Sequence, residues 1–246
     1  MSSIEVRKGY ITNKEVVNKG GVVHQAIAHD SATLHVTGEA VYVDDILEPA
    51  GLLHVCCGAS SCAHGRINKM DLSRVEALPG VVAVITAQDV PGHNDISPMH
   101  IRDEEILCSG EIHFHGQPLF AVAAENREIA RRAVRLAQIE VEELPAILDY
   151  DEAMTQKSWV TPPHEMKRGD PAQAIEQSTH RLKGELHMGG QDHFYLEGQA
   201  SMAVPQEEGD MLVYSSTQHP TELQHLVALA LDRADNAMPP YLDSQV

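Results

Sequence analysis

Hydrophobic and polar positions alternate with two different periods over residues 26–150, which predicts one compact unit of strands and helices behind a polar tail, residues 1–25. Helices are expected over residues 73–78 and 127–138. Short apolar runs predict strands over residues 52–59, 81–86, 118–124 and 139–141. The second of these strands should be buried, because its run is continuously apolar.

The longer predicted helix joins two predicted strands, so a strand–helix–strand unit occurs at least once. Its apolar positions form a single stripe, and Arg127, Arg131 and Arg135 lie on the opposite face. Arginines along one outer face are typical of a solvated helix surface rather than of a nucleic-acid contact. If the flanking strands are parallel neighbours, their connection should be right-handed.

A second unit is predicted over residues 168–246, after a linker over residues 151–167 that contains Pro162 and Pro163. Its first helix should begin after the N-cap acceptor Asp170 and run to about Gln177. The remaining pattern predicts a strand over residues 181–188, a hairpin with strands 200–204 and 211–215, and a helix opened by Pro220. This last helix has an apolar side that needs a covering partner.

A glycine pair, Gly189 and Gly190, stops the predicted strand, and Gln191, Asp192 and His193 follow it directly. Without a Cβ, both glycines can adopt positive φ and let the backbone approach a bulky group. The amide of Gln191 could then donate to an oxo group or a heterocycle. A plain turn has the same local pattern. Asp192 and His193 could form an acid–base pair, but neighbouring strand residues point to opposite faces, which favours structural roles.

Composition narrows the classes of partner. The chain has 36 acidic and 18 basic side chains and a net charge of −18. Nucleic acids and anionic membranes are bound mainly through Lys and Arg, so neither is expected as a partner. No apolar run reaches the roughly 18–20 residues needed to cross a bilayer, and the polar N-terminus does not resemble a signal peptide. The cytoplasm is therefore the expected location.

Cysteine and histidine side chains are potential metal ligands in this chain. No C-x-x-C pair occurs, which predicts buried free thiols at Cys56, Cys57, Cys62 and Cys108. Residues 91–116 are rich in His, Asp and Glu, and His113 and His115 would share one face of an extended strand. A carboxylate could complete a zinc or iron triad there. The spacing matches no closed metal motif, so a polar loop is the preferred interpretation.

The run GGQDHFYLE at residues 189–197 is accompanied by further motifs in a fixed order, at residues 29–32, 38–46, 63–67, 78–84, 116–122 and 142–146. Together these segments resemble the molybdenum-binding subunit of the xanthine dehydrogenase branch of the molybdenum hydroxylase family. The resemblance covers most of the chain. It implies an α/β (α+β) fold, with a hammerhead-type domain over residues 26–150 and the first part of a molybdopterin-binding domain over residues 168–246.

The resemblance also implies an activity, the oxidative hydroxylation of purines such as hypoxanthine and xanthine to urate. A molybdenum ion held by molybdopterin would supply a metal-bound hydroxide as nucleophile. Gln191 matches the glutamine that the family places near an oxo ligand of molybdenum, and Gly190 is the second expected cofactor contact. Electrons would leave through [2Fe-2S] clusters and FAD to NAD.

The pattern departs from that of the family after the last predicted helix. The glycine-rich segment and the catalytic glutamate of the family do not occur before residue 246, so no catalytic residue is assigned, and the chain is expected to be a fragment that is inactive alone. Because the hammerhead-like motifs begin near the N-terminus, the iron–sulfur and flavin centres are expected on a partner subunit of a hetero-oligomer. Two alternatives stay open: a related hydroxylase of aldehydes or other N-heterocycles, and a non-catalytic hammerhead module for binding or assembly.

Overall fold

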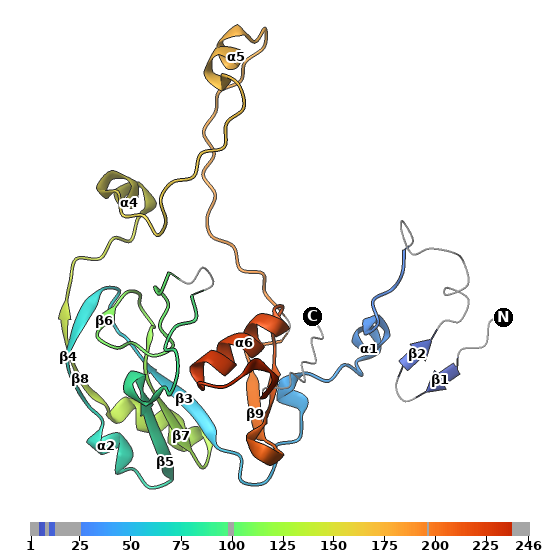
Figure 1. Ribbon diagram of the computed structural model, residues 1–246, viewed down its shortest axis with the longest axis vertical. Helices are drawn as coiled ribbons and strands as arrows, with labels where there is room; N and C mark the ends of the chain where they lie inside the picture. Colours follow the sequence, from blue (N-terminus) through green and yellow to red (C-terminus); the bar gives the residue numbers. More distant parts are fainter. Residues whose placement is uncertain (1–4, 8–9, 13–25, 98–100, 196, 238–246) are drawn as a thin grey trace.

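The computed structural model describes residues 5–7, 10–12, 26–97, 101–195 and 197–237. Sheets and helices gather in a main body, and an arm that carries α4 and α5 extends from it (Figure 1). All strand pairs in the described residues are antiparallel. The first elements along the chain are β1 (Glu5–Arg7), β2 (Tyr10–Thr12), α1 (Ala32–Thr37) and the 3-10 turn η1 (Val43–Asp45).

The first sheet has the strand order β3-β7-β5, with bounds β3 (His54–Ala59), β5 (Val81–Thr86) and β7 (Pro118–Ala124). The predicted strands are thus confirmed. The central strand β7 is the most buried of the three, as expected for a strand that is paired on both edges. The prediction that β5 is buried was wrong, because β5 is an edge strand and exposes Val82 and Ile85.

The second sheet has the order β6-β4-β8, with bounds β4 (Gly65–Asp71), β6 (Glu111–Ile112) and β8 (Gln138–Glu143). The hydrophobic core lies between this sheet and the first, since partly buried side chains of β4 and β8 pack against the buried side chains of β7. Phe120 is the largest fully buried residue in this core. The hydrophobic effect of burying these side chains joins the two sheets into one body.

Short helices complete the main body: α2 (Ser73–Glu76), α3 (Arg127–Ala133), and the 3-10 turns η2 (Ala87–Asp89) and η3 (Val134–Leu136). The Asn126 side chain caps α3 by accepting a hydrogen bond from the Ile129 amide. Ala130 and Ala133 are buried and the predicted outer arginines are exposed, which confirms the orientation of this helix. The strands on either side of α3, β7 and β8, lie in different sheets, so they are not the parallel neighbours for which a right-handed connection was expected.

A glycine allows the first sheet to pack tightly around Phe120. Gly58 on β3 is paired with Phe120 on β7, and a Cβ at this position would lie 2.1 Å from Cε1 of the Phe120 ring. The ring therefore occupies the space that a side chain on β3 would need. Such close approach is a common reason for glycine within a strand.

The arm contains α4 (Tyr150–Gln156) and α5 (Pro171–Gln177). The N-cap at Asp170 is confirmed, because its side chain accepts a hydrogen bond from the Gln173 amide. Most of α4 lies within residues 151–167, where the sequence predicted a linker. The side chain of Asp149 caps its N-terminus by accepting from two amides of the first turn, and none of its residues is buried, although Tyr150, Ala153 and Met154 share one face.

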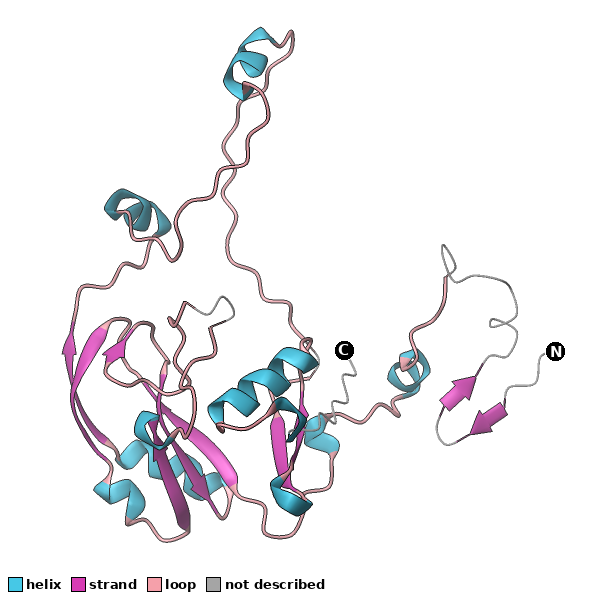
Figure 2. Ribbon diagram, viewed as in Figure 1, coloured by secondary structure: helices cyan, strands magenta, loops and turns pink. Residues whose placement is uncertain are grey.

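The predicted strand over residues 181–188 does not form. This segment is unpaired chain in the arm (Figure 2), and its apolar residues Leu182, Leu186 and Met188 are at least 78% exposed. A strand requires a hydrogen-bonded neighbour, and no strand among the described residues pairs with this segment. Alternation alone predicted the face that each side chain takes, but not the existence of a partner.

The last part of the chain forms the predicted hairpin and helix. The hairpin consists of β9 (Ser201–Pro205) and β10 (Met211–Ser215), joined through the 3-10 turn η4 (Glu207–Gly209). The helix α6 (Pro220–Ala230) follows, and the 3-10 turn η5 (Asp235–Ala237) comes after it. The last residues, 238–246, lie outside the described residues.

The C-terminal end of α6 docks onto the main body. The amides of Gly92 and His93, which follow η2, donate hydrogen bonds to the carbonyls of Ala230 and Leu229, each at 2.9 Å. These are among the carbonyls at the end of a helix that have no partner within the helix. Ala228 is fully buried, whereas the apolar side that the sequence predicted is only partly covered, because Leu223, Leu226, Val227 and Ala230 are partly buried.

All four cysteines are free, as predicted. Cys108 is buried, whereas Cys56 and Cys62 are partly exposed. The prediction of burial was wrong for Cys57, which is exposed. Its position on the edge strand β3 explains this, because alternate side chains of an edge strand face away from the core.

Candidate functional site

The run at residues 189–197 lies where the chain of the arm rejoins the main body (Figure 1). Gly190 and Gln191 are exposed, and neither Gly189 nor Gly190 adopts a positive φ. The left-handed residue of the run is instead Phe194, with φ 57°. The left-handed residue therefore lies four residues beyond Gly190, the second glycine of the pair.

Short-range contacts shape this turn. Oδ1 of Asp192 accepts a hydrogen bond from the Phe194 amide at 3.0 Å, which is an Asx-type turn. The rings of His193 and Tyr195 stack with centroids 5.8 Å apart and planes inclined by 6°. These contacts give Asp192 and His193 structural roles, in line with the interpretation that the sequence favoured.

A long-range hydrogen bond fixes the end of the same run. Oε1 of Glu197 accepts from the amide of Val43 at 2.8 Å, between residues 154 positions apart. Val43 is the first residue of η1, in one of the motifs that carried the family resemblance. Glu197 is the last residue of the run, and no local pattern in the sequence indicates a partner so distant in the chain.

A groove of about 560 Å³ lies beside this hydrogen bond, between η1, β3 and β9. Its apolar walls include Val43 and Met202. Its ionisable side chains are Asp44, Glu48, His54 and Arg127. Because acidic and basic groups are mixed along it, the groove favours no single charged class of ligand.

The His-rich loop, residues 91–116, is held by amide and backbone contacts. The side chain of Asn94 donates to the carbonyl of Leu107 at 2.7 Å and accepts from its amide at 3.0 Å. Oε1 of the buried Gln117 accepts from the His113 amide at 2.8 Å. Among the described residues no group of three His, Cys, Asp or Glu is placed to hold a metal ion; His100 lies outside them.

A polar cluster on the second sheet surrounds His64. Its Nδ1 lies 2.6 Å from the Pro145 carbonyl and its Nε2 lies 3.3 Å from Glu111. Arg66 lies between Glu111, at 4.0 Å, and Glu142, at 3.5 Å. Both neighbours of the ring are acceptors, so only the doubly protonated imidazole satisfies both. The Pro145 carbonyl and then the hydrogen bond to Glu111 accordingly raise the pKa of His64 above the ordinary histidine value.

The raised pKa of His64 predicts how stability changes with pH. The contacts of the imidazolium stabilise the fold fully below the unfolded pKa of about 6.5, and this stabilisation is lost as the pH rises through the folded pKa. The loss of stability caused by His64→Gln should therefore be larger at about pH 6 than at about pH 8.5. Urea denaturation at both values measures it, with the exposed His115→Gln as control. A loss that is equal at both pH values would contradict this prediction.

Two family profiles match the chain in succession. Residues 37–145 match the profile described as aldehyde oxidase and xanthine dehydrogenase, a/b hammerhead domain, and residues 152–238 match the molybdopterin cofactor-binding domain. The chain belongs to the aldehyde oxidase and xanthine dehydrogenase family. The α/β (α+β) fold class, a hammerhead domain followed by the start of a molybdopterin-binding domain, is thus confirmed. The finer boundaries at residues 25, 150 and 167 stay predictions.

Relatives in this family include both kinds of enzyme. The chain is 39% identical over 214 residues to the xanthine dehydrogenase of Dictyostelium discoideum, an alignment that covers 87% of this chain and 16% of the relative. It is 36% identical over 213 residues to aldehyde oxidase 4 of Cavia porcellus, covering 85% and 15%. The chain thus spans about a sixth of the length of these relatives.

Solved structures share the fold. The aldehyde oxidoreductase from Desulfovibrio gigas superposes with a TM-score of 0.75 at 24% identity, covering 87% of this chain and 26% of the other. This likeness extends over the hammerhead unit and beyond it. Among the described residues of the present chain, no helix is long and apolar enough to cross a membrane.

Membership of this family implies that the complete protein binds molybdopterin, and the residues expected to contact it are Gln191 and Gly190. Gln191 offers an amide donor, but it is exposed, and a Cβ built on Gly189 or Gly190 would have no other atom within 4 Å. A cofactor of this size is held from several sides, so one open amide does not make a site that fits it. The assignment of Gln191 and Gly190 as cofactor contacts stays a prediction.

Proposed function

We propose that this chain is part of a molybdenum hydroxylase that oxidises the purines hypoxanthine and xanthine to urate. The observation that carries the proposal is the succession of the hammerhead and cofactor-binding profiles together with 39% identity to a xanthine dehydrogenase. Purines are preferred over aldehydes as substrates because the xanthine dehydrogenase relatives reach 39% identity and the aldehyde oxidase relatives reach 36%.

The proposal includes the electron path. Molybdopterin would supply the two-electron redox chemistry when bound, and [2Fe-2S] clusters and FAD would carry the electrons on to NAD. We further propose that an iron–sulfur- and flavin-bearing partner binds this chain in a cytoplasmic hetero-oligomer. The family resemblance supports these carriers, and the net charge of −18 favours neither nucleic acid nor an anionic membrane as partner.

The protein purified from its source organism tests this function. Its molybdenum, iron and flavin contents are measured, and turnover is followed with xanthine, hypoxanthine, an aromatic aldehyde and quinoline, each with NAD or an artificial electron acceptor. We expect urate from xanthine and a kcat/KM for xanthine at least about tenfold above that for the aldehyde, a difference of about 1.4 kcal/mol in transition-state binding. A preference for the aldehyde or quinoline would assign a related hydroxylase. Molybdenum-loaded protein without any turnover would overturn the proposal and favour a binding or assembly module.

A further inference from the structure

The hydrogen bond between Glu197 and Val43 links the segment before β9 to the 3-10 turn η1, near the start of the hammerhead domain. Val43 opens η1, and the first amides of a helical turn have no partner within that turn. The amide before it, that of Tyr42, is satisfied by Oδ2 of Asp45 at 3.0 Å. Glu197 satisfies the next one at 2.8 Å. An ionised carboxylate is a strong acceptor for such an amide, particularly where the contact is partly buried.

Glu197 is itself held on its C-terminal side. Oγ of Ser216 donates to the Gly198 carbonyl at 3.0 Å, and it accepts from the Ala200 amide at 3.1 Å. The Ser216 amide in turn donates to the Ala200 carbonyl at 3.1 Å. The residues after Glu197 are therefore fixed to the end of β10, so its carboxylate reaches η1 from a defined position.

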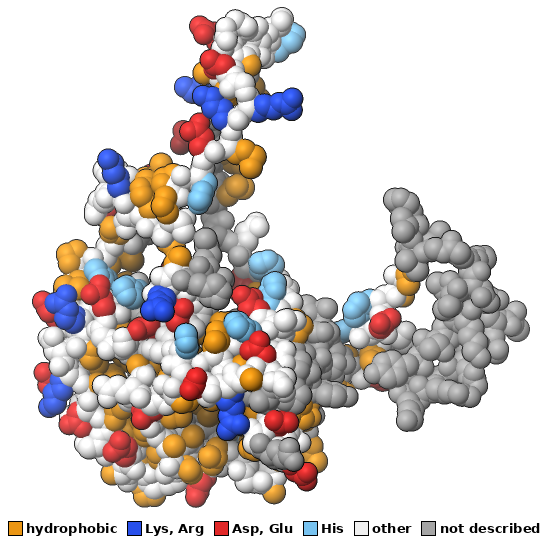
Figure 3. All heavy atoms as spheres, in the orientation of Figure 1, with side chains coloured by type: hydrophobic (Ala, Val, Ile, Leu, Met, Phe, Trp, Pro, Cys, Tyr) orange, Lys and Arg blue, Asp and Glu red, His pale blue; other side chains and the backbone are white. Residues whose placement is uncertain are grey.

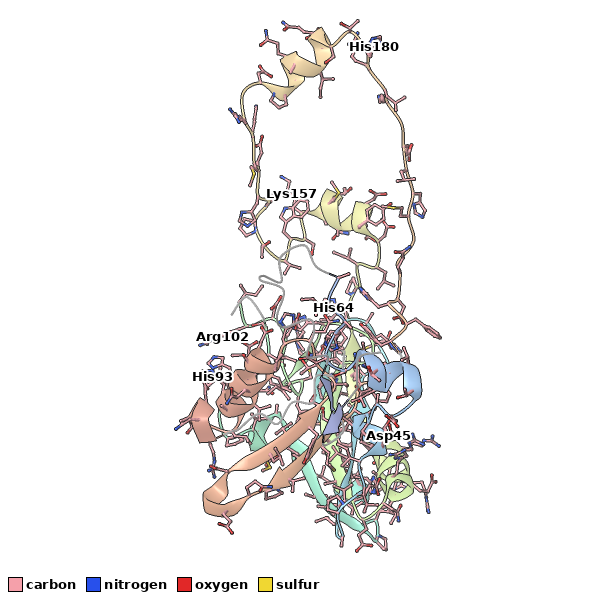
Figure 4. All side chains as sticks on the ribbon, turned by 90° about the vertical axis from the view of Figure 1, so that its right-hand side faces the viewer. Asp45, His64, His93, Arg102, Lys157 and His180 are labelled. Atoms are coloured by element: carbon pink, nitrogen blue, oxygen red, sulfur yellow. The ribbon has the colours of Figure 1, made fainter. Side chains whose placement is uncertain are left out.

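Among the described residues, those from 181 to 195 make no hydrogen bond to the main body. Residues 181–195 are exposed, and the arm to which they belong extends far from the main body, with α5 and His180 at its far end (Figure 4). Tyr150, Met154 and Met166 of the arm are exposed to solvent. Figure 3 shows hydrophobic side chains on the surface of the arm. Within the run, the Asp192 turn and the stacked rings of His193 and Tyr195 give local order without a contact to the body.

We propose that Glu197 is a positioning residue, which holds the run from Gln191 against the start of the hammerhead domain through the Val43 amide. Glu197 determines where the end of the run meets the main body. The role of Gln191 in this inference rests on the proposed function, whereas the hydrogen bond itself does not. Glu197 also adjoins the groove, because Val43 and Gln199 both line it.

Two variants of equal length separate the acceptor from the bulk of the side chain. Glu197→Gln keeps a carbonyl oxygen where Oε1 lies, and Glu197→Met fills similar space without a hydrogen-bond acceptor of useful strength. Glu176→Met on the exposed helix α5 is the matched control. Hydrogen exchange in the full chain is followed by mass spectrometry for a peptide that covers residues 41–47, with a peptide from β7 as an internal measure of folding.

Glu197→Met should speed exchange in the η1 peptide by at least about tenfold, while exchange in β7 stays unchanged. Glu197→Gln should restore exchange to within about threefold of the wild type, and the control should match the wild type. Unchanged exchange in Glu197→Met, or equally fast exchange in both Glu197 variants, would overturn the positioning role. If Glu197→Met also speeds exchange in β7, the variant has lost its fold. Exchange of the η1 peptide in Glu197→Gln then decides: exchange close to that of the wild type supports the positioning role, and faster exchange overturns it.

The same variants in the complete enzyme separate this inference from the proposed function. Loss of kcat in Glu197→Met with recovery in Glu197→Gln would support the positioning of Gln191. If the enzyme turns over no purine but Glu197→Met still shows rapid η1 exchange, the proposed function is overturned and the contact to Val43 is established. Full kcat in Glu197→Met despite rapid η1 exchange would overturn the link between this contact and Gln191.

Discussion

Replacing Phe120 by alanine should lower the free energy of unfolding by about 3–5 kcal/mol, the largest effect expected of any single substitution in the main body. The ring is 1% exposed and lies in the core between the two sheets. Its removal loses the burial of an aromatic side chain and leaves a cavity that β3 cannot fill, because Gly58 lies opposite. Urea denaturation of the full chain, followed by far-UV circular dichroism, measures the change.

Phe114→Ala provides the matched control for this prediction. Phe114 is 48% exposed, so its removal should change the free energy of unfolding by less than about 1 kcal/mol. Equal losses in the two variants would mean that Phe120 does not occupy the core as described.

Gly92→Ala should release α6 from the main body. A Cβ at Gly92 would lie 2.0 Å from the carbonyl oxygen of Leu229 and 2.7 Å from the amide nitrogen of Asp232. Both are backbone atoms, so no side-chain rotation relieves the overlap and the two segments have to separate. The hydrogen bonds from Gly92 and His93 would then break, at a total cost of about 1–3 kcal/mol in the docking of α6.

Hydrogen exchange of a peptide that covers residues 223–230 reports this release. It should be faster in Gly92→Ala, while exchange in β7 stays as in the wild type. Gly110→Ala is the control, because a Cβ there would have no other atom within 4 Å and the residue has no positive φ. Unchanged exchange in α6 would show that the contact to Gly92 does not hold the helix.

Two links between the hammerhead unit and the following part of the chain depend on backbone amides. Gly92 and His93 satisfy the end of α6, and Glu197 satisfies the start of η1. Amides and carbonyls at the ends of helical turns have no hydrogen-bond partner within the turn. Each of the two parts of the chain therefore supplies a partner for such a group in the other part. The groove with Asp44 and Arg127 lies beside the second of these links.

Sequence alone determined most of the helices and strands that have a strong local signal. Asp170 and Pro220 predicted the starts of α5 and α6 through capping and proline geometry, and the acidic turn before Asp210 predicted the β9–β10 hairpin. The ordered motifs also identified the family, since they depend on residue identity rather than on contacts.

Only the tertiary structure decided burial, pairing and the shape of the predicted site. The alternating segment 181–188 has strand periodicity but no partner, and the apolar run of β5 lies at a sheet edge. Glu197 meets Val43 across 154 positions, and the turn of the run lies at Phe194 rather than at the glycines. Local preferences fix which side of the chain is apolar, but a hydrogen bond or a buried face requires a neighbour, and that neighbour comes from a distant part of the sequence.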